Sequence, residues 1–289
     1  MFVTGPVPAA ITAAIAESFD AADQPAGADG VLATLPTRID ESFLDAAGPQ
    51  LRIVANYGVG VDNIDLEAMR RRGVVVANTP DVLTDATAEF AIGLTLALIR
   101  RIVEGDRFLR AWRDWGFGVE FMLGEGLKGK RFAVVGPGRI GRATARLAQA
   151  FGAVPVFAGR GDELHAVLAS ADIVSIHTPL TPKTRHLIDA PALAAMQSHA
   201  VLVNTARGAV VDEHALIEAL TAGTIAGAAL DVHEHEPHVA AELLSMENVV
   251  VTPHIASATR ETREAMGILA VRALRAVLLE GRTPPNVVV

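Results

Sequence analysis

Three polar side chains follow apolar runs of the sequence, where a parallel sheet would present them to a ligand. Arg207 comes directly after VLVNTA, Glu236 lies just beyond a run that ends at Asp231-Val232, and His254 closes VVVTPH. Ligands of open α/β sheets bind at the carboxyl ends of the strands. The three side chains are therefore candidates for one site.

These residue types suit the reduction of a 2-keto acid by hydride transfer. Such a reaction needs a cation for the carboxylate, a donor that polarises the carbonyl and a proton for the developing alkoxide. Arg207 can provide the first two and His254 the proton, while Glu236 can hold the imidazole and favour its charged form. Each also has an ordinary interpretation: an ion pair for Arg207, a loop end for Glu236 and a packed core imidazole for His254.

The histidines and acids at 233–238, in the run HEHEPH, could be taken for a metal site. Alternating ligands on an extended chain point to opposite faces, so we expect no metal there. The chain also has no cysteine, which excludes disulfides, thiolate nucleophiles and zinc–sulfur sites.

A glycine-rich hexapeptide has the pattern GxGxxG: Gly136, Pro137, Gly138, Arg139, Ile140 and Gly141. The hexapeptide alone is a weak signal, because glycine-rich turns are common. It follows the apolar run FAVV directly and opens a helix at Arg139, which is the context of a dinucleotide fingerprint. Phosphate oxygens would then bind at the helix N-terminus, where free amides and the macrodipole favour negative charge.

The end of the next apolar run bears on the choice of cofactor. NAD-binding domains usually place an acid about 20 residues past the fingerprint, to bind the ribose hydroxyls. Here that position is Gly159, and Arg160 follows it, a pair that suits a 2′-phosphate. We therefore expect NADP to be preferred over NAD. The alternative is that Arg160 is a solvated loop residue and Asp162 supplies the acid.

Apolar runs alternate with helical patterns along nearly the whole chain, which is typical of a parallel α/β fold. A long helix from about 85 to 109 and an irregular glycine-rich segment separate two such series. Strands are expected at 1–4, 30–35, 51–57 and 73–78, and then at 131–136, 154–158, 172–178, 200–206, 226–232 and 248–254. Helices are expected near 40–47, 65–72, 139–151, 163–169, 190–196, 213–221 and 259–279.

The second series, with six strands and intervening helices, describes a complete doubly wound dinucleotide domain. We therefore expect two doubly wound parallel-sheet domains. Residues 81–261 would form a Rossmann NAD(P)-binding domain, inserted into a flavodoxin-like substrate domain made of 1–80 and 262–289.

The bulk composition limits the partners. The 289 residues are 51% hydrophobic and 20% charged, which allows sizeable cores. A formal net charge of −8 disfavours nucleic acid and anionic membranes. The N-terminus lacks the basic start of a signal peptide, and the longest apolar stretch, 90–99, is about half a membrane span. We expect a soluble cytoplasmic protein with no nucleic-acid or membrane partner.

In its motifs the chain resembles the D-isomer-specific 2-hydroxyacid dehydrogenase family, most closely its glyoxylate/hydroxypyruvate reductases. The resemblance runs from about Leu51 to Met266. Its motifs, in order, are NYGVGVDNID (56–65), NTPDVLTDATAEFA (78–91), GPGRIG (136–141), SIHTPLT (175–181), NTARGAVVD (204–212), ALDVHEHEP (229–237) and TPHIASATRETREAM (252–266).

The resemblance implies an NAD(P)-dependent reductase of glyoxylate or hydroxypyruvate. In that family pattern, Arg207 binds and polarises the keto acid, Glu236 supports the histidine and His254 is the acid/base. The amides of Val59 and Gly60 would bind the substrate carboxylate. A homodimer through the long helix and the glycine-rich segment is also implied. The residues implied to line the cofactor are Thr178, Pro179, Ala206 and Asp231.

Two departures from the family pattern bear on this hypothesis. The N-terminal lobe is short, and the stretch 160–164, at the adenosine end, is shorter than the family pattern.

Two other functions are alternatives to this hypothesis. A D-3-phosphoglycerate dehydrogenase usually needs extra basic groups for the phosphate, and the GVGVDN loop has none. An NAD(H)-sensing scaffold like the C-terminal-binding corepressors would act by binding partners, but no disordered tail or recruitment groove is evident.

Overall fold

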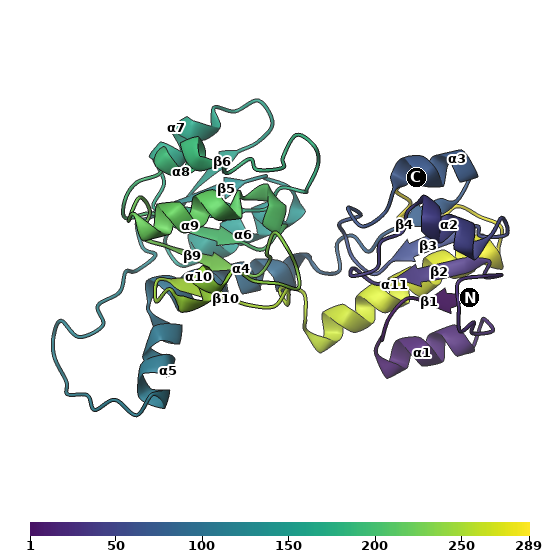
Figure 1. Cartoon of the computed structure of the whole chain (residues 1–289), viewed down its shortest axis with the longest axis horizontal. Coiled ribbons are helices and arrows are strands. Elements are labelled where there is room, and N and C mark those ends of the chain that lie inside the picture. Colours follow the sequence, from purple (N-terminus) through teal and green to yellow (C-terminus); the bar gives the residue numbers. More distant parts are fainter. The chain divides into compact units, whose positions relative to one another are not determined.

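The computed structural model describes all 289 residues, which form two compact units (Figure 1). Unit 1 comprises Met1–Leu83 and Ser257–Val289, and unit 2 comprises Thr84–Ala256. The chain therefore leaves unit 1, completes unit 2 and returns. The boundaries expected from the sequence, after residues 80 and 261, lie close to these two crossings.

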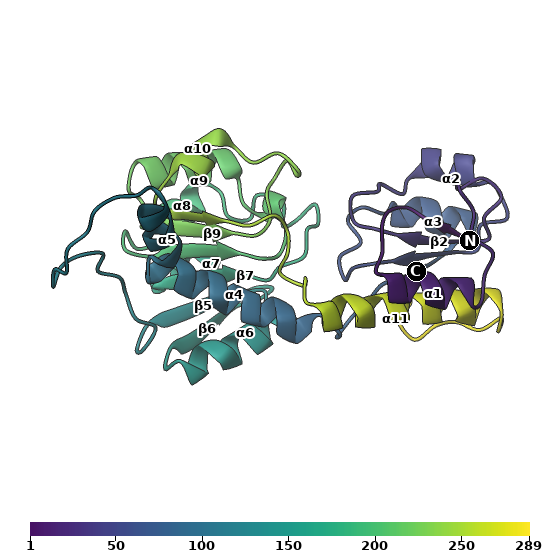
Figure 2. The same cartoon turned by 90° about the horizontal axis from the view of Figure 1, so that it is seen from below.

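Unit 1 is built on a parallel sheet of order β1-β2-β3-β4. Ala22 forms an isolated parallel bridge with Phe2 on the free side of β1, so the order of strands across the sheet reverses at β1, as in flavodoxin-like sheets. Helices α2 and α3 cover one face and helices α1 and α11 the other (Figure 2). The elements are β1 (Phe2–Val3), α1 (Ala9–Ala16), β2 (Gly30–Ala33), α2 (Glu41–Ala47), β3 (Ile53–Asn56), α3 (Leu66–Arg72), β4 (Val75–Ala77) and α11 (Arg260–Leu278).

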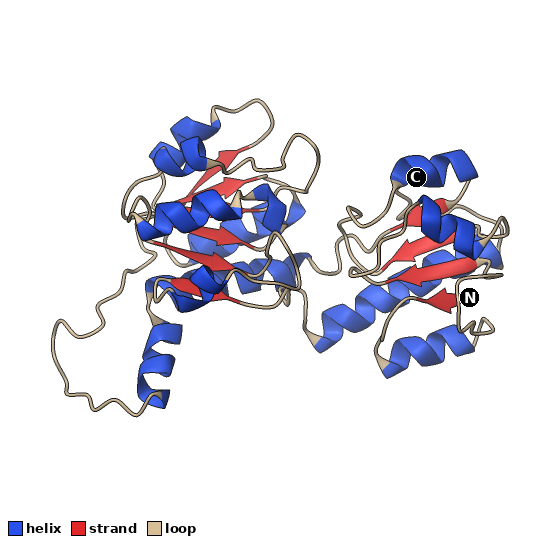
Figure 3. Cartoon of the chain, viewed as in Figure 1, coloured by secondary structure: helices blue, strands red, loops and turns tan.

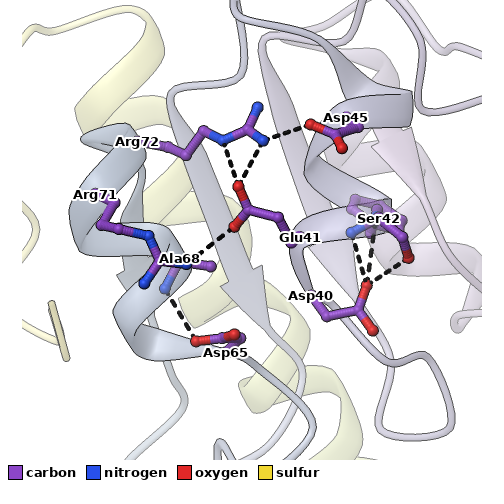
Figure 4. A network of polar contacts seen from close by, with 9 residues as sticks. Asp40, Glu41, Ser42, Asp45, Asp65, Ala68, Arg71 and Arg72 are labelled. Carbon is purple, nitrogen blue, oxygen red and sulfur yellow. Dashed lines mark hydrogen bonds and ion pairs between the residues drawn. The ribbon is translucent and has the colours of Figure 1, made fainter.

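Side chains at the ends of α2 and α3 join the two helices on the surface of unit 1 (Figure 4). Glu41 accepts a hydrogen bond from Arg72 at 2.6 Å, and Arg72 also pairs with Asp45. Asp40 and Asp65 cap the helices, because their carboxylates accept hydrogen bonds from first-turn amides. The exposed ion pairs contribute little stability each, so the caps are the stronger local determinants of these helices.

Unit 2 contains a six-stranded parallel sheet of order β10-β9-β8-β7-β5-β6, with helices on both faces (Figure 3). The order reverses between β5 and β7, so this sheet is doubly wound and its topological switch point lies at their carboxyl ends. The elements are α4 (Thr84–Ile99), α5 (Ile102–Arg110), β5 (Arg131–Val135), α6 (Arg139–Ala150), β6 (Val154–Ala158), α7 (Leu164–Ala169), β7 (Ile173–Ile176), α8 (Ala190–Ala194), β8 (Val201–Asn204), the 3₁₀ helix η1 (Gly208–Val210), α9 (Glu213–Thr221), β9 (Gly227–Leu230), α10 (Ala241–Ser245) and β10 (Val249–Val251).

The alternation of side chains along the strands divides the core of unit 2 into two layers. Phe132 and Val134 of β5 pack with α4 and α6, whereas Ala133 and Val135 face α7, α8, α9 and α10. Because both faces of the central strands are covered, these strands are mostly apolar, which is why they are recognisable in the sequence as short apolar runs.

The single long helix expected over 85–109 is wrong, because the chain forms two helices there. Arg101 adopts a left-handed conformation, with φ of 55°, between α4 and α5. The amide of Glu125 donates to the carbonyl of Ile99 at 2.8 Å and so satisfies the end of α4. Helix α5 buries none of its residues, and it extends away from the rest of unit 2 together with the segment after it (Figure 1).

No helix of the chain has both the length and the apolarity that a membrane crossing requires. The cytoplasmic location stays a prediction.

An uncharged imidazole lies directly after β7. Ser175 Oγ and His177 Nε2 are 2.8 Å apart. Burial lowers the pKa of His177 from 6.5 to about 4. The folded protein therefore holds this ring neutral at pH values where an unfolded chain binds a proton.

We predict that the free energy of unfolding falls as the pH is lowered from about 6.5 to about 4. In this range the unfolded chain takes up a proton at His177 that the folded chain does not, an effect of up to about 3 kcal/mol. Urea unfolding of His177→Gln should depend less steeply on pH than that of the wild type. The exposed His165→Gln is the matched control, and an equal change in both variants would contradict the prediction.

Candidate active site

The three predicted catalytic side chains follow neighbouring strands of unit 2. Strand β9 pairs with β8 on one side and with β10 on the other. Arg207, Glu236 and His254 lie in the loops that begin at the carboxyl ends of β8, β9 and β10. The topology therefore places all three at one edge of one sheet.

A buried amide shapes the loop that carries Arg207. Asn204 ends β8 with 1% of its surface exposed. Its side chain donates to the carbonyl of Arg207 at 2.9 Å and accepts from the amide of Ala206 at 3.0 Å. Both hydrogen bonds turn the chain sharply after β8, and Arg207 remains partly exposed in an extended conformation.

Gly208 brings this loop into backbone contact with the loop that carries Glu236. A Cβ built on Gly208 would lie 1.9 Å from the carbonyl carbon of His233 and 2.4 Å from the nitrogen of Glu234. No side chain fits there without moving backbone. The backbones of the two loops that carry Arg207 and Glu236 are thus in direct contact.

Glu236 and His254 form the pair that the sequence predicts. His254 Nδ1 lies 2.9 Å from Glu236 Oε2, and the amide of His233 donates to Glu236 Oε1 at 3.0 Å. Burial alone would raise the pKa of Glu236. The hydrogen bond and charge of His254 and the amide of His233 outweigh burial and bring this pKa below its ordinary value. Glu236 therefore remains a carboxylate near neutral pH, and Nε2 is the ring nitrogen of His254 left for proton exchange.

A second carboxylate fixes the backbone around His254. Asp231 is fully buried, and its side chain accepts hydrogen bonds from Thr252 Oγ1 at 2.6 Å and from the amides of Ile255 and Ala256 at 2.8 Å each. Its own carbonyl accepts from the amide of His254 at 2.7 Å, where φ is 55°. Sequence reasoning missed this structural function, although an acid at the end of an apolar strand was a signal. That Asp231 also lines the cofactor stays a prediction.

The fingerprint glycines have the geometry that a dinucleotide pyrophosphate needs. Gly136 has φ of 93°, and a Cβ there would lie 2.5 Å from Thr178 Oγ1. A Cβ on Gly141 would lie 2.5 Å from the carbonyl of Gly136, but one on Gly138 would meet open space. Gly138 is the N-cap of α6, so the open position lies at the positive end of a helix, at the switch point of the sheet. The residues present therefore fit this cofactor.

The other residues expected to line the cofactor lie around this point with different exposure. Thr178 is buried, and its hydroxyl donates to the carbonyl of Val135 at 3.1 Å. Pro179 and Arg139 are exposed, while Ile140 and Ala206 are partly buried. Their contacts with the cofactor stay predictions.

The tip after β6 holds a base and an acid. Arg160 is exposed. Asp162 Oδ2 accepts from the amide of Gly159 at 2.7 Å, so this carboxylate folds back over the end of the strand. Both charges are thus placed where the adenosine end of a dinucleotide would bind.

Val59 and Gly60 follow β3 in unit 1. Asn78 donates to the carbonyl of Val59 at 2.8 Å, and Asn56 donates to the carbonyl of Gly60 at 2.6 Å. Neither amide of the pair donates a hydrogen bond within the unit. Sequence reasoning missed the two asparagines, which fix the carbonyls and leave the amides available to an anion.

Comparison with known proteins gives consistent matches. The family described as D-isomer specific 2-hydroxyacid dehydrogenase, NAD binding domain, matches residues 92–256. Glyoxylate reductase of Thermococcus litoralis is 45% identical over 277 residues, which cover 90% of this chain and 83% of that protein. Glyoxylate reductase of Aeropyrum pernix is 46% identical over 280 residues, with the same coverage.

Two solved structures cover almost the whole chain. A protein of Thermus thermophilus superposes with a TM-score of 0.92 at 42% identity, covering 100% of this chain and 99% of that one. The NADPH-dependent glyoxylate/hydroxypyruvate reductase of Sinorhizobium meliloti, in complex with NADP and malonate, superposes with a TM-score of 0.89 at 35% identity. The superposition covers 99% of this chain and 95% of that one.

Proposed function

Because this chain belongs to the D-isomer-specific 2-hydroxyacid dehydrogenase family, we propose that it reduces glyoxylate or hydroxypyruvate to the 2-hydroxy acid. The chain is an oxidoreductase that uses a nicotinamide dinucleotide. The observation that carries the proposal is the pair of Glu236 and His254, with 2.9 Å between Oε2 and Nδ1. This pair supplies a proton donor at the carboxyl edge of the sheet, where ligands of open α/β sheets bind.

The proposed catalytic residues have distinct functions. The guanidinium of Arg207 binds the substrate carboxylate and polarises the keto oxygen. His254 donates its Nε2 proton to the oxygen as negative charge develops there. Glu236 accepts the Nδ1 proton in a hydrogen bond, which orients the ring and stabilises its charged form. When bound, the reduced cofactor supplies the hydride.

The proposed substrate-binding residues include Val59 and Gly60 of unit 1. Their amides have no acceptor within the unit, and two adjacent amides suit a carboxylate. The contribution of these two residues is binding rather than chemistry.

We expect the purified protein to oxidise NADPH or NADH with glyoxylate and hydroxypyruvate, and to form the D-isomer of glycerate from hydroxypyruvate. His254→Ala should lose on the order of 100-fold in kcat, because a positioned proton donor is removed. Cofactor affinity, measured by fluorescence titration, should stay near that of the wild type.

His214→Ala is the control, because its side chain is 83% exposed on α9. Full turnover in His254→Ala would contradict the catalytic assignment. Dinucleotide binding without turnover of any 2-keto or 2-hydroxy acid would contradict the proposed function and favour a binding protein.

We further propose a preference for NADP. Arg160 is exposed, and Gly159 directly before it carries no acidic side chain that would repel a 2′-phosphate. Arg160→Ala should lower kcat/KM for NADPH by about 10-fold and should affect NADH less, because a charge-assisted contact is lost. Asp162→Asn keeps an acceptor for the amide of Gly159 but removes a repelling charge, so it should not impair NADPH. Equal losses with both cofactors in Arg160→Ala would assign that residue to loop structure alone.

A homodimer is the proposed assembly, formed through α5 and the segment 111–126. Trp112 and Phe117 in this segment are 94% and 90% exposed, and further apolar side chains are exposed around them. Exposed apolar surface on this scale is typical of an interface. In sedimentation velocity the protein should be a dimer, and the double variant Trp112→Ser, Phe117→Ser should shift towards monomer. The control Phe151→Ser, at an exposed site outside the segment, should stay dimeric, and a monomeric wild type would exclude the assembly.

A further inference from the structure

The carboxylate of Glu234 joins three segments of unit 2 at the edge of the sheet that carries the proposed catalytic pair. Its side chain is only 8% exposed. Oε1 accepts from Arg185 Nη2 at 2.9 Å and lies 2.7 Å from His186 Nε2. Oε2 accepts from the amide of Glu213 at 3.3 Å. Arg185 and His186 lie in the loop that follows β7, Glu213 begins α9, and Glu234 itself follows β9.

The backbone of Glu234 is held as firmly as its side chain. Its amide donates to Glu213 Oε2 at 3.1 Å, so Glu213 and Glu234 bind each other twice. The peptide that joins His233 to Glu234 also packs against Gly208. Glu213 begins α9, so the peptide at 233–234 is hydrogen-bonded to the first residue of a helix.

The loop after β7 is itself bound to the loop that carries Arg207. The amide of His186 donates to the carbonyl of Ala209 at 2.9 Å, and the amide of Ile188 donates to the carbonyl of Val210 at 3.1 Å. Glu234 thus binds a loop that is itself hydrogen-bonded to the Arg207 loop. Removing its carboxylate would remove the side-chain hydrogen bonds that join the loop after β9 to Arg185, His186 and the amide of Glu213.

The contacts of Glu234 lead to His254 in few steps. The amide of His233, one residue before Glu234, donates to Glu236 Oε1, and Glu236 Oε2 pairs with His254 Nδ1. A shift of the peptide at 233–234 therefore moves the donor that orients Glu236. Displacement of a catalytic group by about 1 Å can reduce turnover by about 100-fold.

Glu234 stays charged in this environment. Burial would raise its pKa, but the hydrogen bonds from His186 and the Glu213 amide and the charges of His186 and Arg185 lower it below the ordinary value. Asp212 also faces His186, with 3.8 Å between Oδ2 and Nδ1. The charged carboxylate strengthens each hydrogen bond that it accepts.

We propose that Glu234 is a positioning residue, which holds the His233–Glu234 peptide and through it orients Glu236 against His254. The catalytic part of this inference rests on the proposed function; the orientation of His254 does not. Glu234 touches neither substrate nor cofactor in this role.

The test compares Glu234→Ala, Glu234→Gln and the wild type by kinetics and by NMR titration of the histidine ring signals. Glu234→Ala should lower kcat by about 10-fold or more, while KM for the keto acid and the cofactor changes little. The kcat profile and the His254 signal should both move to lower pH, because a misplaced Glu236 supports the protonated ring less. Glu234→Gln should be intermediate, since its amide oxygen still accepts from Arg185 and His186.

Two further variants separate positioning from stability and from charge. Glu213→Ala removes the acceptor of the Glu234 amide and should reproduce the effect. Glu218→Ala, 69% exposed on the same helix, should change neither kcat nor the His254 titration. If Glu234→Ala does not fold, the comparison rests on Glu234→Gln and Glu213→Ala.

A folded Glu234 variant with wild-type kcat and an unmoved His254 signal would overturn the proposal, as would a loss of stability alone. The NMR titration needs no turnover. If the wild type reduces no keto acid but His254 still titrates at lower pH in the variants, the proposed function fails and the positioning role stands.

Discussion

The proposed active site depends on one buried charge, the carboxylate of Asp231 at the end of β9. A carboxylate taken out of water is tolerated only when hydrogen bonds replace its hydration. Here one hydroxyl and two backbone amides do so, and they belong to the segment that carries His254. Satisfying this charge therefore requires the loop after β10 to take one shape, including the left-handed conformation of His254. The position of the proposed acid follows from that requirement.

The remaining acids at this edge act on the same loops from different directions. Glu236 pairs with the imidazole of His254, while Glu234 binds the loop that follows β7 and the first residue of α9. Gly208 allows these loops to approach until their backbones touch. Adjacent parallel strands supply the loops at a fixed spacing, and buried carboxylates then determine how the loops fold over one another. The sheet therefore sets the spacing of the proposed catalytic residues, and the carboxylates set the conformation of the loops that carry them.

Much of this arrangement was predictable from the sequence, because its signals are local. The apolar runs predicted the strands of both sheets, and the GxGxxG context predicted the turn at Gly136 and the start of α6. The break at Arg101 was not predictable, since the amide that ends α4 comes from Glu125, far along the chain. The close approach at Gly208 also depends on packing between distant segments. A local pattern carries no record of such partners.

The division of unit 1 into two sequence segments has a consequence for how the chain folds during synthesis. Unit 2 is continuous in sequence and can form its sheet while α11 is still unmade. The core of unit 1 lacks one face until α11 packs on β2 and β3, where Arg52 donates to the carbonyl of Val277 at 2.7 Å. A nascent chain therefore carries an incomplete sheet with an exposed apolar face until this helix leaves the ribosome. Unit 1 is therefore the part of the molecule whose apolar surface stays exposed longest during synthesis.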